Sequence, residues 1–467
     1  MRPWLFSLLF LCPTWLSEFA LHAGDSAIRP NVLFIAIDDL NHWVGYTGRN
    51  KQAQTPNIDR LSRMGVSFIN AHCASPLCNP SRAALMSGLR ASSSGCYQNE
   101  QDWKQLIPEG KGLAYTFKQA GYSALGAGKI YHSDSYYPGE WTEYFKEKPV
   151  GKSAGSIGKD DGFKQPMLHD LKDSDISDWH IADYCIEQLG KTHDKPFFLA
   201  CGLHKPHLPW VVPKKYYDQF PLATIELPPY LENDLDDLPT SGLKMANPKQ
   251  DHDVILAKDR WKLAIQSYLA SCAYTDMNIG RLLDALEKSP NKNNTIIVLW
   301  GDHGWHLGEK HHWRKFSLWE EATRAPLIWV APGVATPNTI CARTVDFMSI
   351  YPTLCALTGI EKPAHVTGEN IIPLLRDPKA PWSTPALCTF GYQNHAVRSE
   401  QWRYIRYANG DEELYDEITD PYEWTNVAGK PEYAGIKAEL ARFFPSENKP
   451  HVRSAKTSAK EEKSDKE

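Results

Sequence analysis

The stretch Asn31-Val32-Leu33-Phe34-Ile35-Ala36-Ile37-Asp38-Asp39 decides how the chain is organised. Its apolar run, from Val32 to Ile37, has the length of a strand and is typical of a parallel strand covered on both faces. The run ends in two adjacent carboxylates, which are costly beside a buried strand unless water or a cation neutralises them. The Asp pair is therefore either an ordinary turn or cap, or half of a cation site.

Two later apolar runs also end in polar side chains. Residues 196–203 are followed by His204 and His207, and residues 295–300 are followed by Asp302 and His303. In open α/β sheets, ligands bind outside the carboxyl ends of the strands. We therefore expect His207, Asp302 and His303 to converge with the Asp pair at one edge of a sheet.

The alternation of strand-like and helical segments predicts an α/β fold, in which a large mixed, mostly parallel sheet lies between helices. Residues 260–286 have a helical pattern, which we expect to be interrupted near residues 276–280. Short strands near residues 386–391, 396–397, 402–407 and 413–416, followed by a helix over 431–444, predict a smaller C-terminal α+β subdomain. The predicted division is a signal peptide over 1–23, a catalytic domain over 24–375, the subdomain over 376–445 and a disordered charged tail over 446–467.

Composition and the N-terminus indicate an exported protein. Residues 1–23 combine Arg2, an apolar run and small residues, as a secretory signal does, and no segment has the length of a membrane span. We expect a periplasmic or extracellular location. A net charge of −5 gives no support to nucleic-acid binding. The cysteines are compatible with disulfides without fixing any pairing, and the oligomeric state is left open.

The segment Cys78-Asn79-Pro80-Ser81-Arg82 reads as a loop that enters a helix. We expect Pro80 at the first helical position and Gly88 as the left-handed cap at the end. An exposed Cys78 at the helix N-terminus would be placed to become an anionic nucleophile. The alternative is a buried, inert cysteine in front of an ordinary helix.

With these clusters, the chain resembles the type I sulfatases of the alkaline-phosphatase superfamily, whose cysteine is oxidised to Cα-formylglycine. It is most similar to the iduronate-2-sulfatase-like branch, with its fold of a large mixed sheet and a C-terminal subdomain. The resemblance extends from Asn31 to about Asn426. It is carried by Asp38-Asp39 and by residues 55–59, 78–88, 128–132, 204–207, 301–305, 313–315, 413–416 and 420–421.

The resemblance implies a divalent cation, usually Ca²⁺, because several carboxylates suit a hard cation. The implied metal ligands are Asp38, Asp39, Asp302, His303 and an oxygen of the modified Cys78. His303 departs from the amide that many sulfatases have there. Its nitrogen is not the donor that Ca²⁺ prefers, and a supporting role for His303 is the alternative.

The resemblance also implies the catalytic groups. The hydrated aldehyde at residue 78 would attack sulfur after Asp302 accepts its proton, and Arg82 would orient its oxygens. Lys129, Lys315 and His207 would hold the sulfuryl group, and His207 or Lys315 would protonate the leaving alkoxide. His132 would then deprotonate the second hydroxyl, so that sulfate leaves and the aldehyde returns. Candidates for the wall of the substrate pocket are His72, Trp305 and His306.

The implied partners are a sulfated carbohydrate, with an exo-acting iduronate-2-sulfate-like activity, and a formylglycine-generating maturation enzyme. Two other functions compete with this one. The same superfamily contains phosphoester and phosphonate hydrolases, and a third reading is a glycan-binding relative without catalysis. The third reading predicts losses among the catalytic residues, yet all of these are present: Asp38, Asp39, Cys78, Arg82, Lys129, His207, Asp302 and Lys315.

Overall fold

The fold is built on an eight-stranded mixed sheet with the strand order β11-β2-β10-β7-β1-β6-β4-β5. The computed structural model describes residues 29–133, 135–146 and 171–452. Strand β1 (Asn31–Ile37) lies between β6 (Phe197–Leu203) and β7 (Thr295–Gly301) and is parallel to both. Strands β4 (Ser123–Gly128) and β5 (Glu143–Phe145) continue the parallel part. The predicted large, mostly parallel sheet is confirmed.

The other edge of the sheet contains its antiparallel strand. Strand β10 (Leu327–Val330) runs antiparallel to β7 and to β2 (Val66–Phe68), and β11 (Thr339–Cys341) is parallel to β2. Strand β2 ends at Phe68, and the chain turns at Asn70, whose amide donates to Thr344 Oγ1 (2.6 Å). Strand β3 (Ala71–His72) then pairs with β12 (Val345–Asp346).

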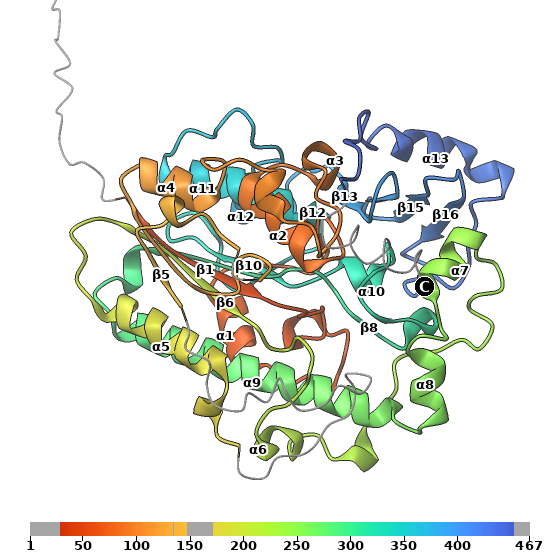
Figure 1. The fold of residues 1–467 in the computed structure, drawn as a ribbon, viewed down its shortest axis with the longest axis horizontal. Helices are drawn as coiled ribbons and strands as arrows, with labels where there is room; N and C mark the ends of the chain where they lie inside the picture. The colour runs from red at the N-terminus through yellow and green to blue at the C-terminus, as the bar shows by residue number, and fades with distance from the viewer. Residues whose placement is uncertain (1–28, 134, 147–170, 453–467) are drawn as a thin grey trace, which may run out of the picture.

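Helices cover both faces of the sheet (Figure 1). Alternate residues of β1 enter different cores, as the two-residue period of a strand requires. Val32, Phe34 and Ala36 pack with α2 (Cys78–Ser87), α4 (Leu113–Gln119), α11 (Ile350–Thr358) and α12 (Ile372–Arg376). Leu33, Ile35 and Ile37 pack with α1 (Pro56–Met64), α5 (Ser177–Gly190) and α9 (Trp261–Lys288).

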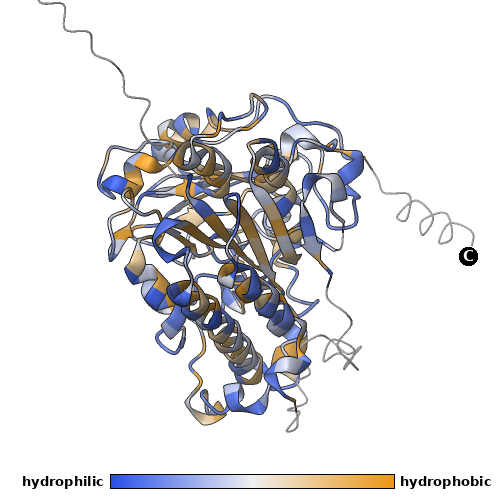
Figure 2. Ribbon diagram, turned by 90° about the vertical axis from the view of Figure 1, so that its left-hand side faces the viewer, coloured by the Kyte–Doolittle hydropathy of each residue, from blue (hydrophilic) through white to orange (hydrophobic). Residues whose placement is uncertain are grey.

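Apolar residues concentrate in the strands, and the helices carry polar residues as well (Figure 2). None of the helices among the described residues has the length and apolarity needed to cross a membrane.

Helix α9 is continuous, so the predicted interruption near residues 276–280 is wrong. Gly280, which suggested a break, serves packing instead. A Cβ on Gly280 would lie 2.6 Å from Asn57 Cγ, so the missing side chain lets α1 approach α9.

Shorter elements connect the layers. The region over residues 214–257 contains three short helices: α6 (Lys214–Tyr217), α7 (Thr240–Ala246) and α8 (His252–Ala257). The antiparallel pair β8 (His306–Leu307) and β9 (Trp313–Arg314) leads to Lys315. The remaining short helices are α3 (Ala91–Ser94) and α10 (Glu320–Thr323).

The C-terminal subdomain contains a four-stranded antiparallel sheet in chain order, as predicted. Its strands are β13 (Ala386–Thr389), β14 (His395–Arg398), β15 (Trp402–Arg406) and β16 (Glu412–Asp416). A 3-10 turn (Pro431–Tyr433) and α13 (Ala434–Ala441) occupy most of the predicted final helix.

The segment after α13 contacts the catalytic domain. The Lys449 backbone N–H donates to Ser92 O (2.8 Å), and Gln101 Nε2 donates to Val452 O (3.0 Å). Residues 446–452 of the predicted tail therefore lie against the loop that follows α3. The rest of the tail and the predicted signal peptide lie outside the described residues.

Candidate active site

Polar side chains from several strand ends meet at one place. Asp38 and Asp39 follow β1, and Asp302 and His303 follow β7. The Asp39 backbone N–H donates to Asp302 Oδ1 (3.0 Å), which joins the two strand ends. Cys78 Sγ lies 3.3 Å from His303 Nε2 and 3.9 Å from Asp39 Oδ1. The sheet thus brings its charged strand ends to the start of α2.

Helix α2 begins at Cys78 and ends before Gly88, whose φ of 70° is the predicted left-handed cap. Pro80 occupies the third helical position and not the first, which is tolerated because N–H groups of the first turn have no partner within the helix. Cys78 is fully buried, so the predicted exposure is wrong. Burial raises the pKa of the Cys78 thiol, which therefore stays neutral in its unmodified form.

Two lysines neutralise the Asp pair. Lys129 Nζ donates to Asp38 Oδ2, and Lys315 Nζ lies 2.6 Å from Asp39 Oδ1 and 3.1 Å from Cys78 Sγ. Burial raises the pKa of Asp38, but the charges of Lys129, His207, Arg82 and Lys315 outweigh it and hold that pKa well below its usual value. The pKa of Asp39 is lowered for the same reasons, with Lys315 as its strongest neighbour after burial.

Asp302 differs from the Asp pair because burial raises its pKa in spite of Arg82. Arg82 Nε donates to Asp302 Oδ2 (2.8 Å), and its other nitrogens donate to Asp38 Oδ1 (3.4 Å) and to the backbone oxygen of Lys129. Arg82 was expected to orient the oxygens of residue 78. In the structure it holds two carboxylates in place, and any effect on residue 78 passes through them.

Three histidines face or border the cluster. Since a carbonyl only accepts, His303 Nδ1 donates to Gly304 O (2.9 Å), which leaves a lone pair on Nε2, 3.4 Å from Asp39 Oδ1. His207 Nδ1 likewise donates to Leu208 O (2.6 Å), and its Nε2 lies 3.8 Å from Asp39 Oδ2. Burial lowers the pKa of all three imidazoles, that of His132 to about 4. They are neutral at pH 7 in this state.

The cluster fits a divalent cation. Two sets of potential ligand atoms each lie within 4.8 Å of one another, one from Asp38, Cys78, Asp302 and His303, the other from Asp38, Asp39, Cys78 and His207. Asp39 Oδ2 is buried and accepts no hydrogen bond. Three carboxylates supply the oxygen donors that Ca²⁺ prefers, and His303 Nε2 presents its lone pair beside them.

Sequence reasoning missed one supporting residue, Asp178, and expected another, Trp305, in the wall of the pocket. Asp178, near the start of α5, accepts from the backbone N–H groups of His204 and Lys205 (2.8 Å each) and so fixes the loop that carries His207. One acidic residue at a helix start has no pattern that reveals this role. The ring of Trp305, buried beside the site, lies 5.3 Å from Lys315 Nζ.

The other two residues expected in the pocket wall, His72 and His306, are also buried, and each imidazole lies beside another polar side chain. His306 Nε2 lies 2.9 Å from Ser317 Oγ, and His72 Nε2 lies 2.8 Å from Asn70 Oδ1.

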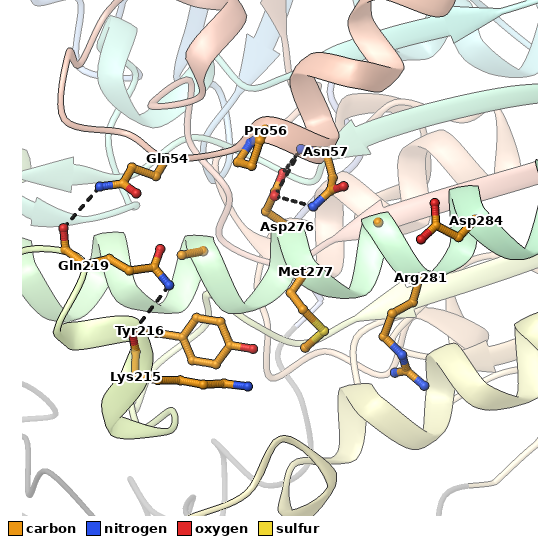
Figure 3. Close-up of a pocket in the computed structure, with 12 residues that line it drawn as sticks. Gln54, Pro56, Asn57, Lys215, Tyr216, Gln219, Asp276, Met277, Arg281 and Asp284 are labelled. Carbon is orange, nitrogen blue, oxygen red and sulfur yellow. Dashed lines mark hydrogen bonds between the residues drawn. The ribbon is translucent and has the colours of Figure 1, made fainter.

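A separate cavity of 500 Å³ lies between α1, α6 and α9 (Figure 3). Its charged side chains have partners. Asp276 accepts from the Asn57 and Ile58 backbone N–H groups at the start of α1, and Arg281 pairs with Asp183. None of its lining residues belongs to the Cys78 cluster, so this cavity is not part of the candidate active site.

Two family models match the chain. The sulfatase family matches residues 30–360, and a family described as N-sulphoglucosamine sulphohydrolase, C-terminal, matches residues 308–449. Among curated proteins, the chain is similar to a sulfatase of Formosa agariphila (37% identity, covering 90% of this chain and 87% of that protein). It is also similar to human iduronate 2-sulfatase (30% identity, covering 71% and 70%).

Solved structures share the fold. A protein in complex with its substrate D-glucosamine-2-N,6-O-disulfate has a TM-score of 0.71 at 23% identity, covering 89% of this chain and 96% of the other. The phosphonate monoester hydrolase of Agrobacterium radiobacter has a TM-score of 0.73 at 21% identity, covering 89% and 94%.

Proposed function

This chain belongs to the sulfatase family and is a sulfuric ester hydrolase, and from that premise we propose that it cleaves sulfate esters of sugars through a formylglycine at residue 78. The observation that carries the proposal is the surroundings of Cys78 Sγ. This atom lies within 4 Å of Lys315 Nζ, His303 Nε2 and Asp39 Oδ1. A neutral, buried thiol is a poor nucleophile there, whereas the surrounding charges suit an oxygen nucleophile.

A formylglycine supplies, as its hydrate, one hydroxyl that attacks sulfur and a second whose collapse to the aldehyde releases sulfate. Asp302 accepts the proton of the first hydroxyl. His132 accepts the proton of the second, because burial keeps its imidazole neutral at pH 7.

Lys129 and Lys315 hold the sulfuryl oxygens. Asp39 and its neighbours outweigh burial and raise the pKa of Lys315, so this lysine stays charged and acts as an electrostatic clamp. His207 then donates the proton to the leaving alkoxide. It is half-buried and exchanges protons with water, and an anionic ester beside Nε2 favours its protonated form.

Asp38, Asp39, Asp302 and His303 would hold the divalent cation, which we propose to be Ca²⁺. When bound there, it would supply Lewis-acid chemistry to the sulfuryl group and the attacking hydroxyl. The protein's own part is to fix these ligands, with Arg82 bracing Asp302 and Asp38.

The substrate is a sulfated saccharide. The similarity to human iduronate 2-sulfatase supports an exo-acting enzyme for uronate-2-sulfate-like units. The signal-like residues 1–23 support export to the periplasm or the extracellular space, with a maturation enzyme converting Cys78 in the producing cell.

The competing activity is phosphoryl or phosphonyl transfer, for which the phosphonate monoester hydrolases provide the same fold. A direct test compares kcat/KM for 4-methylumbelliferyl sulfate and 4-methylumbelliferyl phosphate on protein whose residue 78 is converted. We expect the sulfate ester to be preferred by at least about 100-fold, or about 2.7 kcal/mol in the barrier. Preference for the phosphate ester would overturn the proposed function.

A further inference from the structure

A second cavity, of 280 Å³, lies beside the segment that carries Lys315 and is called the side pocket here. It is lined by residues of the α7–α8 region, by the segment around Lys315 and by the turn after β13, chiefly Lys244, Asn247, Gln250, Arg314, Phe316 and Phe390. Its volume is close to the lower end of the range of about 300–1,000 Å³ that small-ligand pockets occupy.

The side pocket is connected to the active site through the backbone of the catalytic segment. Arg314 and Phe316 flank Lys315, whose Nζ lies 3.1 Å from Cys78 Sγ. The Phe316 backbone N–H donates to Pro76 O (3.4 Å), two residues before Cys78. One wall of the pocket is therefore the backbone that presents the lysine to the scissile sulfate.

The opposite wall adjoins, along the chain, a residue that lies near Gln98, and Gln98 contacts the start of α2. Phe390 precedes Gly391, where a Cβ would lie 3.7 Å from Gln98 Nε2. The backbone oxygen of Gln98 accepts from Asn79 Nδ2 (2.9 Å), and Asn79 follows Cys78 in α2. The side pocket thus lies between the lysine segment and the C-terminal sheet, within one residue of contacts to the active-site helix.

The backbone around Lys315 is strained. Arg314 and Phe316 have φ angles of 72° and 75°, in the left-handed region that side chains other than glycine rarely occupy. Such strain is concentrated at functional sites. Here it turns alternate side chains apart: Lys315 reaches Asp39, whereas Arg314 and Phe316 line the side pocket.

The lining chemistry suits a charged sugar. Asp251 is occupied by Arg314, whose Nε and second terminal nitrogen lie 2.7 Å and 3.1 Å from the two carboxylate oxygens. Lys244 is exposed at the rim and adds a positive charge. Phe390 and Phe316 offer ring faces for sugar C–H groups, and the amides of Asn247 and Gln250 can bond hydroxyls.

The cavity drawn in Figure 3 differs from the side pocket in its charged groups and in its position. It is larger, but its acid Asp276 caps α1, its base Arg281 is paired with Asp183, and it lies on α1, α6 and α9 away from the Lys315 segment. The side pocket combines an exposed cation, ring faces and the catalytic backbone.

We propose that the side pocket is a saccharide subsite that holds the sugar unit next to the one carrying the scissile sulfate, with a carboxylate or sulfate of that neighbouring unit facing Lys244. This rests on the proposed function, since it presumes a sulfated glycan at Cys78. It makes the enzyme selective for oligosaccharides with an acidic neighbouring unit.

The test uses inhibition of 4-methylumbelliferyl sulfate hydrolysis by a sulfated, uronate-containing tetrasaccharide prepared from heparin. We expect Lys244→Met to weaken inhibition by about tenfold, as loss of a charged hydrogen bond does. Phe390→Ala weakens it as well. The matched control Lys249→Met, an exposed residue that does not line the pocket, leaves it unchanged. Turnover of the aryl sulfate stays within about twofold in all three variants, because this small ester occupies only the catalytic cluster.

The dependence on salt separates the contribution of the Lys244 charge to tetrasaccharide binding from that of the Phe390 ring. At about 0.5 M NaCl the difference between Lys244→Met and wild type disappears by screening, whereas the effect of Phe390→Ala persists. Equal inhibition of wild type and Lys244→Met at low salt overturns the subsite, and so does a tetrasaccharide that fails to inhibit wild type at about 1 mM. Failure of wild type to hydrolyse the aryl sulfate would instead overturn the proposed function itself.

Discussion

The molecule buries two clusters of three carboxylates with their cations, and they differ in which groups face the carboxylates. The catalytic cluster contains Asp38, Asp39 and Asp302 with Arg82, Lys129 and Lys315. The junction cluster contains Glu320, Glu417 and Glu423 with Arg398 and Arg403, and it joins α10 to the C-terminal sheet. Both lie out of water, so burial of charge alone does not distinguish a reactive site from a structural one.

The junction cluster is closed on itself. Arg403 alone pairs with all three glutamates, including Glu423 Oε1 at 2.6 Å, and it donates to Leu318 O (2.9 Å). In the catalytic cluster, Asp39 Oδ2 accepts no hydrogen bond, and a thiol and an imidazole lone pair face the same carboxylate. Glu423 Oε1 of the junction cluster also lacks a hydrogen bond, so the difference lies in the neighbours. A thiol and an imidazole lone pair beside a carboxylate indicate chemistry, whereas carboxylates paired with guanidinium groups indicate a structural contact.

The largest expected effect concerns residue 78. Cys78→Ala removes the reacting atom, and we expect sulfate release to fall by about 10⁴-fold or more. The free energy of unfolding should change by less than about 1 kcal/mol, since a buried thiol without strong bonds is lost. Cys355→Ala, at a buried position of α11, is the matched control and keeps its activity. Comparable turnover by the two variants would remove residue 78 from the mechanism.

Metal removal comes next and should affect only the catalytic cluster. Chelation abolishes activity, and adding back Ca²⁺ restores it and raises the melting temperature, because a ligand at 100 times its Kd stabilises by about 2.7 kcal/mol. Asp39→Asn should lose most of this thermal shift. Glu417→Gln, in the junction cluster, should retain it. Equal shifts in the two variants would contradict the assignment of the ligands.

A substitution in the junction cluster should lower the stability of the fold and leave catalysis unchanged. Arg403→Met leaves Glu320, Glu417 and Glu423 without their shared cation, and we expect a loss of about 3–5 kcal/mol in urea unfolding. The kcat of the protein that remains folded should stay within about twofold of wild type. A large drop in kcat at unchanged stability would show that this cluster takes part in catalysis.

The smallest expected effect is a change in how the free energy of unfolding depends on pH. Burial raises the pKa of Glu423 well above its usual value, so the native state holds a proton that the unfolded state releases. Stability from this group is present at low pH and declines as the pH rises through the raised pKa. Glu423→Gln keeps an acceptor for the Glu320 backbone N–H and should flatten this decline. Urea midpoints between about pH 5 and pH 8 measure it, and an unchanged slope would contradict the raised pKa.

Much of the framework followed from local pattern. The apolar runs of β1, β6 and β7 and the polar residues at their ends predicted a parallel sheet with ligands at one edge, and the strands of the C-terminal sheet were recognisable as short runs between turns. The helix of Cys78, with its Gly88 cap, was also local in origin.

Features that depend on distant side chains were not predictable. Cys78 is covered by His303 and Lys315, which lie 225 and 237 residues further along the chain, so its burial left no trace near residue 78. Two other features are likewise tertiary contacts: the pairing of Arg82 with carboxylates, and the hydrogen bonds from the His207 loop to Asp178. The break expected in α9 was wrong because Gly280 serves the approach of α1.

Mass spectrometry of the tryptic peptide that contains residue 78, from protein made in its native host and active on an aryl sulfate, tests the central claim most directly. The account predicts an aldehyde in place of the Cys78 thiol, trapped as a hydrazone by a hydrazine reagent. A peptide with an intact thiol throughout, from a sample with full sulfatase activity, would contradict it.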